Sequence, residues 1–126
     1  MKKLFLDDLR IPKDAIGLVP DIMNKFYWSN DWIIVRNFWE FCNYIQKFGL
    51  PDYISFDHDL ADNHYDINYE FSENDEKTGY ECAKWLVDWC FDNKKLLPDF
   101  FVHSANPVGK QNINSYLLNS KKYLNL

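Results

Sequence analysis

The sequence lacks a CxxC pair, a signal peptide, a long apolar run and an excess of positive charge, and these absences argue against several classes of protein. Its three Cys form no CxxC pair, and their odd number, together with the lack of a signal peptide, favours a reduced cytoplasmic protein. No apolar run approaches the ~20 residues that span a bilayer, which argues against a membrane protein. A net charge of −5 argues against a broad electrostatic grip on nucleic acid, and so against an extended nucleic-acid groove.

Apolar and aromatic residues are abundant instead. The 126 residues are 47% hydrophobic and 18% aromatic, which predicts a folded globule and argues against disorder. This length predicts a single domain over residues 1–126, which can form a core without disulfides. Cys42, Cys82 and Cys90 stand among apolar residues and are interpreted as core residues, with a reactive thiol or a zinc site as the alternative.

Strands and helices alternate along the chain. Consecutive apolar or β-branched residues predict strands at 2–6, 32–35, 53–56 and 99–102. Apolar residues at helical spacing and capping residues predict helices at 38–48, 79–93 and 109–120. Helical connectors between strands imply parallel pairing. The predicted fold class is therefore α/β, a small doubly wound parallel sheet with helices on both faces.

Three segments are less regular. Residues 13–31 contain Gly17 and Pro20, and predict a loop or a short turn of helix. Residues 61–77 are acidic and predict a long loop, either a lid or a merely mobile segment. The apolar residues 123–126 fit either a short fifth strand or a packed terminus.

Polar clusters follow three of the four predicted strands. They are Asp7-Asp8, Asp57-His58-Asp59 and His103-Ser104, whereas the second strand ends in Arg36-Asn37. The carboxyl ends of parallel strands lie at one edge of the sheet, where open α/β folds bind their ligands. The sequence therefore predicts that these clusters converge on one crevice.

The acidic residues predict a cation site at this crevice. Asp7, Asp8 and Asp57 supply hard oxygen donors, which suit Mg²⁺ or another divalent cation that keeps waters and substrate phosphates as further ligands. The alternative is that Asp7 and Asp8 only end a strand and cap a turn.

The neighbouring donors fit an anion. Arg10 can form a fork onto a phosphate, or a structural salt bridge with Asp8 or Asp59. Ser104 and Asn106 offer neutral donors for a phosphate oxygen, and precede a helix whose amino end can attract an anion. The predicted ligand is a small phosphorylated nucleotide or an RNA terminus.

Other polar and aromatic residues have a functional and a structural interpretation. His58 and His103 are candidates for proton transfer near neutral pH, or are satisfied structural residues. Asp59 and Thr78 are secondary candidates, and the first interpretation of Thr78 is the cap of the helix that follows it. Residues 26–28, Phe-Tyr-Trp, either form a lip on which a base stacks or pack their loop onto the sheet.

Three motifs resemble the receiver domains of response regulators. Leu4-Phe5-Leu6-Asp7-Asp8 is similar to their acidic first strand, Ile54-Ser55-Phe56-Asp57 to their phosphoacceptor strand, and Val102-His103-Ser104 to their hydroxyl-bearing fourth strand. Receivers also carry a Lys at the end of a fifth strand, and no residue here matches it. Lys110 is near, but follows Gly109 in a different segment.

Three longer clusters resemble a receiver-derived family, the cyclic-phosphate processing receiver domain. They are Leu9-Arg10-Ile11-Pro12, Asp57-His58-Asp59-Leu60 and His103-Ser104-Ala105-Asn106-Pro107. The resemblance implies a flavodoxin-like three-layer sandwich with a degenerate last strand. It also implies action on cyclic phosphates, in settings of phage and bacterial conflict or RNA repair.

Three functional hypotheses follow. The first is a metal-assisted phosphoesterase, a cyclic phosphodiesterase acting on a nucleotide or RNA end, with Asp57, His58 and His103 as candidate catalytic residues. Within this class, Asp57 is a metal ligand or a nucleophile that forms an aspartyl-phosphate. The second is a non-catalytic binder, a sponge for a phosphorylated nucleotide signal. The third is a signalling receiver phosphorylated on Asp57.

Overall fold

A computed structural model describes residues 1–60 and 78–124 of the chain. Its elements in chain order are β1 (Lys3–Leu6), η1 (Pro12–Leu18), η2 (Asp21–Met23), α1 (Asn24–Trp28), β2 (Trp32–Val35), α2 (Phe38–Phe48), β3 (Tyr53–Phe56), α3 (Gly79–Asn93), β4 (Asp99–Val102) and α4 (Pro107–Leu124). The predicted loop at 61–77 lies outside the described residues.

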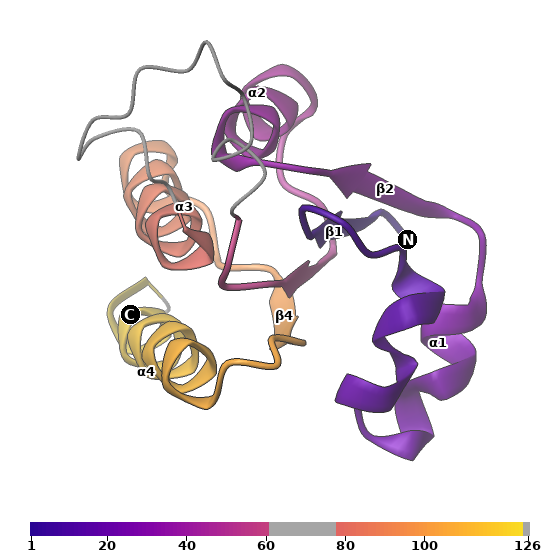
Figure 1. The fold of residues 1–126 in the computed structure, drawn as a ribbon. Coiled ribbons are helices and arrows are strands. Elements are labelled where there is room, and N and C mark those ends of the chain that lie inside the picture. Colours follow the sequence, from indigo (N-terminus) through magenta and orange to yellow (C-terminus); the bar gives the residue numbers. More distant parts are fainter. Residues whose placement is uncertain (61–77, 125–126) are drawn as a thin grey trace, which may run out of the picture.

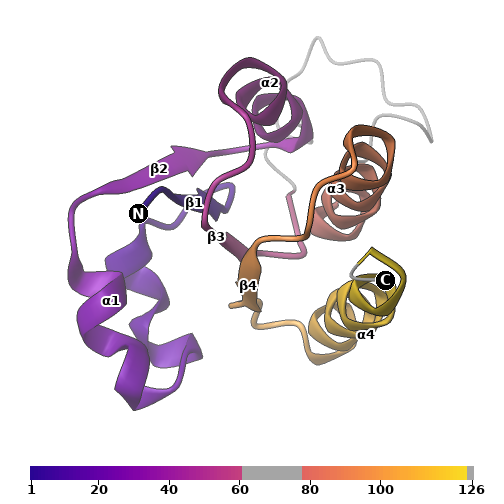
Figure 2. The same ribbon diagram turned by 180° about the vertical axis from the view of Figure 1, so that it is seen from behind.

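The four strands form one parallel sheet in the order β2-β1-β3-β4. The chain steps from β1 outward to β2, and then back past β1 to β3 and β4. Because crossovers between parallel strands are right-handed, these opposite steps place the connections on opposite faces. Figures 1 and 2 show the result: α2, α3 and α4 cover one face, and α1 lies on the other with the turns before it. The predicted α/β fold is confirmed, with four strands in the described residues.

Side-chain alternation along the strands divides the interior into two cores. Leu4, Leu6, Ile54 and Phe56 join the larger core, which packs against α2, α3 and α4. The intervening residues point to the other face, where Phe5 and Tyr53 join a smaller, aromatic core with Tyr27 and Trp32. Every second strand residue therefore faces the α1 layer, and this parity decides where each functional side chain goes.

Most predicted boundaries are confirmed. The strands at 32–35, 53–56 and 99–102 and the helices at 38–48 and 79–93 have the predicted bounds, and the first strand begins one residue later than predicted. Asn37 and Thr78 cap the two helices, because their side chains accept hydrogen bonds from Glu40 N–H and Glu81 N–H at 2.9 and 3.4 Å. The region 13–31 is more helical than the predicted loop or short turn, because η1, η2 and α1 follow one another along most of it.

The last helix is longer than the predicted 109–120. It begins at Pro107, whose fixed φ suits a first helical position, and it continues to Leu124. The Oδ1 atom of Asn106 accepts a hydrogen bond from Gly109 N–H at 3.0 Å and so caps this helix. The prediction of a fifth strand at 123–126 is wrong for 123–124, which are helical, and residues 125–126 lie outside the described chain.

The three cysteines are core residues. Cys42, Cys82 and Cys90 are buried in the larger core, and none of the three forms a disulfide. Burial raises the pKa of Cys82, and it raises that of Cys90 to about 11, so both keep their protons near neutral pH. These thiols fit the structural interpretation rather than a reactive site.

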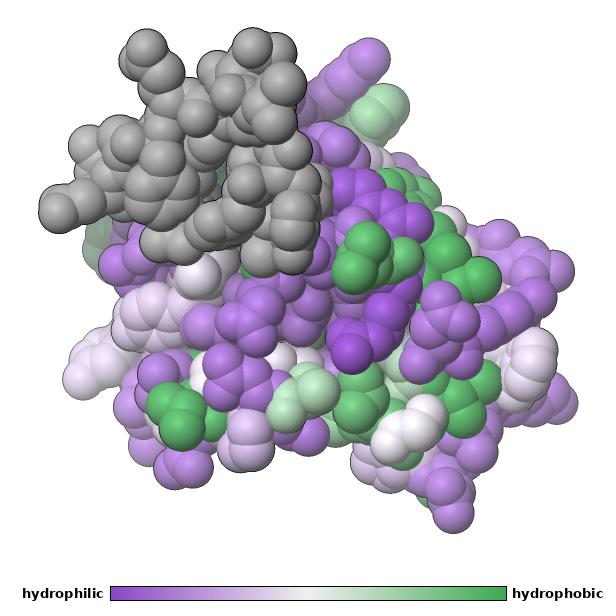
Figure 3. Space-filling view, in the orientation of Figure 1, coloured by the Kyte–Doolittle hydropathy of each residue, from purple (hydrophilic) through white to green (hydrophobic). Residues whose placement is uncertain are grey.

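The face turned toward the viewer in Figure 3 is mainly hydrophilic, and its hydrophobic residues lie in small separate groups. Within residues 1–60 and 78–124, no helix combines the length and the apolar character that a bilayer-spanning segment needs.

Candidate functional site

Three polar residues stand at the same level of the sheet, immediately beyond three strands. Leu6 pairs with Phe56, and Phe56 with Val102, so the next residues in register are Asp7, Asp57 and His103. The backbone N–H groups of Asp57 and His103 still bond to the neighbouring strands, at 2.9 Å in both cases. One ligand atom from each of the three side chains lies within 4.8 Å of the others. The predicted convergence of these clusters is confirmed for this trio.

The Asp7 carboxylate is buried and held on both oxygens. Its Oδ1 accepts hydrogen bonds from the backbone N–H groups of Leu9 and Arg10, at 2.9 and 2.8 Å. Its Oδ2 lies 3.0 Å from Nε2 of His103 and 3.4 Å from Nη1 of Arg10. Burial raises the pKa of Asp7, but the hydrogen bonds from His103 and the two amides outweigh it and lower the pKa overall. Asp7 is therefore ionised at neutral pH.

Asp57 is a second buried carboxylate with fewer stabilising donors. Its Oδ1 accepts a hydrogen bond from the backbone N–H of His58 at 2.8 Å. Burial raises the pKa of Asp57 to about 7, and the negative charge of Asp7 adds to the rise. With this pKa the side chain exchanges its proton near neutral pH. A proton or a cation beside Asp57 would offset the costs of burial and of repulsion by Asp7.

His103 is fully buried beneath the pocket described below. Its ring stacks on Phe5 with centroids 4.5 Å apart and planes 5° from parallel. Nε2 contacts Asp7, and Nδ1 lies 2.7 Å from Oγ of Ser55. Burial lowers the pKa of His103, although the contact with Asp7 opposes this. The imidazole therefore acts on Asp7 and is shielded from solvent.

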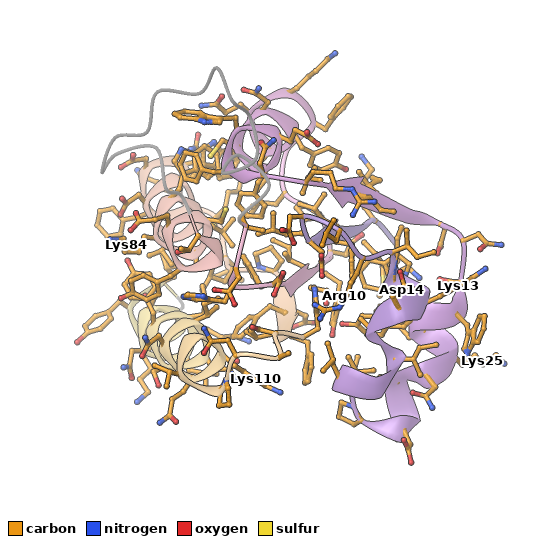
Figure 4. All side chains as sticks on the ribbon, in the orientation of Figure 1. Arg10, Lys13, Asp14, Lys25, Lys84 and Lys110 are labelled. Atoms are coloured by element: carbon orange, nitrogen blue, oxygen red, sulfur yellow. The ribbon has the colours of Figure 1, made fainter. Side chains whose placement is uncertain are left out.

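A pocket of about 230 Å³ opens beside Asp7 and Asp57, which we call the acidic pair. Its lining is Asp7, Asp8, Leu9, Arg10, Asp57, Asp59 and Ala105. Arg10 is the one basic residue of this lining within 1–60 and 78–124, and its side chain is 36% exposed. Figure 4 shows Arg10 near the middle of the view and Lys13 and Lys25 at its edge, on the α1 layer. The predicted Arg10 ion pair is present, but its partner is Asp7 rather than Asp8 or Asp59.

Arg36 fixes the loop that carries Asp7 and Arg10. Its Nη1 donates to the backbone oxygens of Asp7 and Arg10, at 3.1 and 2.6 Å. The sequence analysis predicted that Arg36 follows the second strand, but it predicted no partner for this side chain. Its guanidinium stabilises the turn that presents the acidic pair, and does not line the pocket.

His58 packs on α4 and contacts the pocket-lining Asp59, but does not itself line the pocket. Its Nδ1 lies 2.9 Å from Oδ1 of Asp59, and a Cβ added at Gly109 would lie 2.4 Å from its ring. The start of α3 also packs tightly here, because Gly79 N–H donates to His58 O at 2.7 Å. Of the two histidines predicted at the site, His103 contacts Asp7 of the acidic pair, and His58 contacts the neighbouring Asp59 instead.

The remaining predicted donors hold the loops. Ser104 Oγ accepts a hydrogen bond from Asn106 N–H at 3.0 Å, and Asn106 and Thr78 cap α4 and α3. None of these three lines the pocket, although Ala105 does. A contact of Ser104 or Asn106 with phosphate stays a prediction.

The aromatic run 26–28 mainly packs its layer onto the sheet. Tyr27 is fully buried, and Phe26 packs edge-on against Trp32 and Tyr53, at 5.4 and 4.9 Å between centroids. Trp28 is 57% exposed, with Lys13 Nζ 5.4 Å from its ring centroid. This arrangement favours the packing interpretation over a base-stacking lip for Phe26 and Tyr27.

The sequence analysis predicted no contact with His103 or Asp7 for two buried residues, Ser55 and Tyr27. Ser55 Oγ contacts His103, and the hydroxyl of Tyr27 lies 2.7 Å from Ser55 Oγ. A signal was present, because Ser55 is a polar residue inside an apolar strand and has the same parity as Asp57. Tyr27 carried no such signal, since its contact depends on how the α1 layer docks.

The residues present fit a divalent cation. Asp7, Asp57 and His103 are all buried and close enough to share one ion, and Asp8 and Asp59 line the same pocket. Carboxylate oxygens suit Mg²⁺, and an added imidazole also suits Mn²⁺ or Zn²⁺. Two buried carboxylates repel each other unless a proton or cation lies between them, and the raised pKa of Asp57 reflects first its burial and then this repulsion by Asp7.

The fold and the site define a receiver-like α/β domain with a buried acidic pair at the carboxyl edge of its sheet. The family model of the cyclic-phosphate processing receiver domain matches residues 2–119, and the chain belongs to this family. The family's name indicates cyclic phosphate as the class of substrate.

Other comparisons add only to the fold. The chain is similar to a solved fusion protein that contains the trimeric coiled coil of yeast Spc42, amino acids 181–211. The two are 16% identical with a TM-score of 0.50, and the match covers 98% of this chain and 77% of that chain. The comparison with curated proteins found no match.

Proposed function

We propose that this protein is a metal-assisted phosphoesterase that opens a cyclic phosphate on a nucleotide or RNA end, in phage or bacterial conflict or in RNA repair. The observation that carries the proposal is the buried Asp7–Asp57 pair, which shares a pocket of about 230 Å³ with Arg10. The family assignment supports the class of substrate. A pocket of this volume suits a cyclic phosphate better than an extended strand of nucleic acid.

The charges in the pocket explain why a cation is part of the proposal. Among the described residues of the lining, the buried carboxylates of Asp7 and Asp57 outnumber the single arginine, so a phosphate alone would meet net repulsion from this pair. Asp7, Asp8 and Asp57 would hold Mg²⁺ or another divalent cation. When bound, such an ion supplies Lewis-acid polarisation of the phosphoryl oxygens. Arg10, partly exposed at the pocket, would donate to a phosphate oxygen.

Proton transfer has three candidates in this chain. Asp57 lines the pocket, and without a cation its pKa is about 7, but a cation held by its carboxylate would lower that pKa and keep the group ionised. His103 would act through Asp7, because its ring is buried. His58 would have to leave Asp59 and Gly109 to reach the pocket. We therefore assign Asp57 to holding the cation, and His58 and His103 stay the candidates for proton transfer.

The test is turnover of a panel of 2′,3′-cyclic and 3′,5′-cyclic nucleotides and cyclic dinucleotides with Mg²⁺ or Mn²⁺, with products identified by ³¹P NMR. We expect ring opening that EDTA abolishes and that Asp57→Asn reduces by about a thousandfold or more. Asp92→Asn, which removes an exposed carboxylate on α3, is the matched control and should leave turnover unchanged. No turnover of any panel member with either metal would refute the proposal.

A non-catalytic binder is the second candidate, and one observation favours it. Within the described residues, no imidazole lines the pocket, since His103 is buried and His58 packs on α4. Tight binding of a panel nucleotide that is recovered intact would select this function. Labelling of Asp57 by acetyl phosphate, lost in Asp57→Asn, would instead select the signalling receiver.

A further inference from the structure

A chain of buried hydrogen bonds runs from the α1 layer to the acidic pair. The hydroxyl of Tyr27 lies 2.7 Å from Ser55 Oγ, which lies 2.7 Å from Nδ1 of His103. Nε2 of the same ring lies 3.0 Å from Oδ2 of Asp7. Tyr27, Ser55 and His103 are fully buried, and Asp7 is 1% exposed. The chain thus links four side chains on α1, β3 and the ends of β4 and β1 with almost no access for water.

The acceptor at one end sets the direction of every hydrogen bond. An ionised carboxylate only accepts, so Nε2 of His103 must carry a proton to bond Asp7. In a neutral ring Nδ1 then carries no proton and accepts a hydrogen bond from the Ser55 hydroxyl. Ser55 Oγ, having donated, accepts from Tyr27. Burial raises the pKa of Tyr27, which is consistent with a phenol that keeps and donates its proton.

We propose that Tyr27 and Ser55 are positioning residues that hold His103 in the Nε2–H tautomer, so that its ring anchors Asp7 at the edge of the pocket. The stacking of the ring on Phe5 fixes its plane, and the two hydroxyls fix which nitrogen carries the proton. The importance of this for catalysis rests on the proposed function, whereas the tautomer itself does not.

The opposite arrangement is a chemically defined alternative. If Nε2 of His103 bound the cation directly, it would be bare, and Nδ1–H would donate to Ser55. The contacts of Asp7 favour the first direction, because Oδ2 sits at hydrogen-bond distance from Nε2 and needs a donor there. The two directions predict different tautomers of one ring, and NMR distinguishes them.

The experiment is a long-range ¹H–¹⁵N correlation spectrum of the ¹⁵N-histidine-labelled full chain, with His58→Gln and His64→Gln used to assign His103. We expect a protonated Nε2 and a bare, hydrogen-bonded Nδ1 in the unsubstituted protein. This measurement needs no variant that must fold with an altered core. An Nδ1–H tautomer or a doubly protonated ring near neutral pH would overturn the proposal.

Two substitutions then test the hydroxyls. Ser55→Ala should move the Nδ1 resonance toward that of a free ring nitrogen or mix the tautomers, and Tyr27→Phe should do so to a smaller extent. Tyr44→Phe, which removes a half-buried hydroxyl on α2, is the matched control and should change nothing. An unaltered His103 spectrum in folded Ser55→Ala and Tyr27→Phe would overturn the positioning role.

Titration with Mn²⁺ tests the link to the pocket. Loss of an outer partner of a metal ligand typically lowers metal affinity about 10- to 100-fold, and in this chain that partner is His103. Ser55 acts one contact further out, so we expect Ser55→Ala to lower Mn²⁺ affinity by up to about 10-fold, with a smaller loss for Tyr27→Phe. Unchanged affinity despite a changed tautomer would refute the anchoring of Asp7. If the tautomer and affinity behave as expected but no cyclic phosphate is opened, the proposed function fails and the positioning role stands.

Discussion

Replacing Asp57 by Asn should stabilise the metal-free protein, and the effect should depend on pH. Asp57 is 4% exposed, and burial beside the charge of Asp7 raises its pKa from an ordinary 3.8 to about 7. Below 3.8 both the folded and the unfolded chain hold this proton, so the group contributes nothing. Between 3.8 and 7 the unfolded chain ionises while the folded chain does not, so the stability of the fold declines as the pH rises.

Above about pH 7 the folded protein carries the full cost of the buried charge. At about 1.4 kcal/mol per pH unit, a rise of about three units corresponds to a cost on the order of 4 kcal/mol. Asn has nearly the same shape and no charge, and its carbonyl can still accept the His58 N–H. We therefore expect Asp57→Asn to be more stable than the natural chain near pH 8, by up to that amount, and nearly equal to it near pH 4.

Urea unfolding in EDTA at the two pH values measures this difference, with Asp92→Asn as the control for loss of one exposed negative charge. Adding Mg²⁺ near pH 8 should stabilise the natural chain and have little effect on Asp57→Asn, because the cation replaces the missing counter-charge. Equal stability of the two proteins at high pH would refute the buried-charge reasoning. So would a stabilisation that is the same at both pH values, since that would indicate altered packing.

Three further substitutions test single contacts. Gly79→Ala should destabilise the fold by about 1–3 kcal/mol in urea unfolding, because its Cβ would lie 1.8 Å from the carbonyl oxygen of Asp57; Gly17→Ala, with nothing within 4 Å, should be nearly neutral. Asn106→Ala should cost about 1 kcal/mol of stability through the lost cap of α4, and a calorimetric loss of nucleotide affinity as well would reveal a phosphate contact. Arg10→Lys should weaken calorimetric binding of a 2′,3′-cyclic nucleotide about tenfold, because a guanidinium fork becomes a point charge.

The sheet and most helices were predictable because local patterns decide them. Strand 53–56 is short, mainly apolar and flanked by Pro51 and Asp57, and the folded chain keeps the structure that this local pattern predicts. The 13–31 region has no such pattern, and its turns exist because Tyr27 and neighbouring aromatic residues dock on Phe5 and Trp32. The part of this docking that involves Phe5 and Tyr27 joins residues more than twenty positions apart, which no local period encodes.

The site was predictable to the level of the strand ends but not to the level of side-chain direction. Register and parity bring Asp7, Asp57 and His103 to one face, and this follows from a parallel sheet with aligned strand ends. The even-numbered His58 points the other way, onto α4. The cluster Asp57-His58-Asp59 therefore supplies two residues to the pocket lining rather than three.

The cost of the acidic pair argues that it serves a function. Leu6, Phe56 and Val102, the last residues of their strands, place apolar side chains in the larger core, which stabilises the fold. One residue further on, the chain places two buried carboxylates and a buried imidazole instead, and Asp57 is destabilising when ionised. The surrounding contacts do not remove that cost: Arg10 contacts Asp7, and His103 also bonds Asp7 rather than Asp57. The unbalanced charge of Asp57 faces a pocket, where a cation and its anionic ligand can balance it, and this asymmetry between the two acids is what a binding site requires.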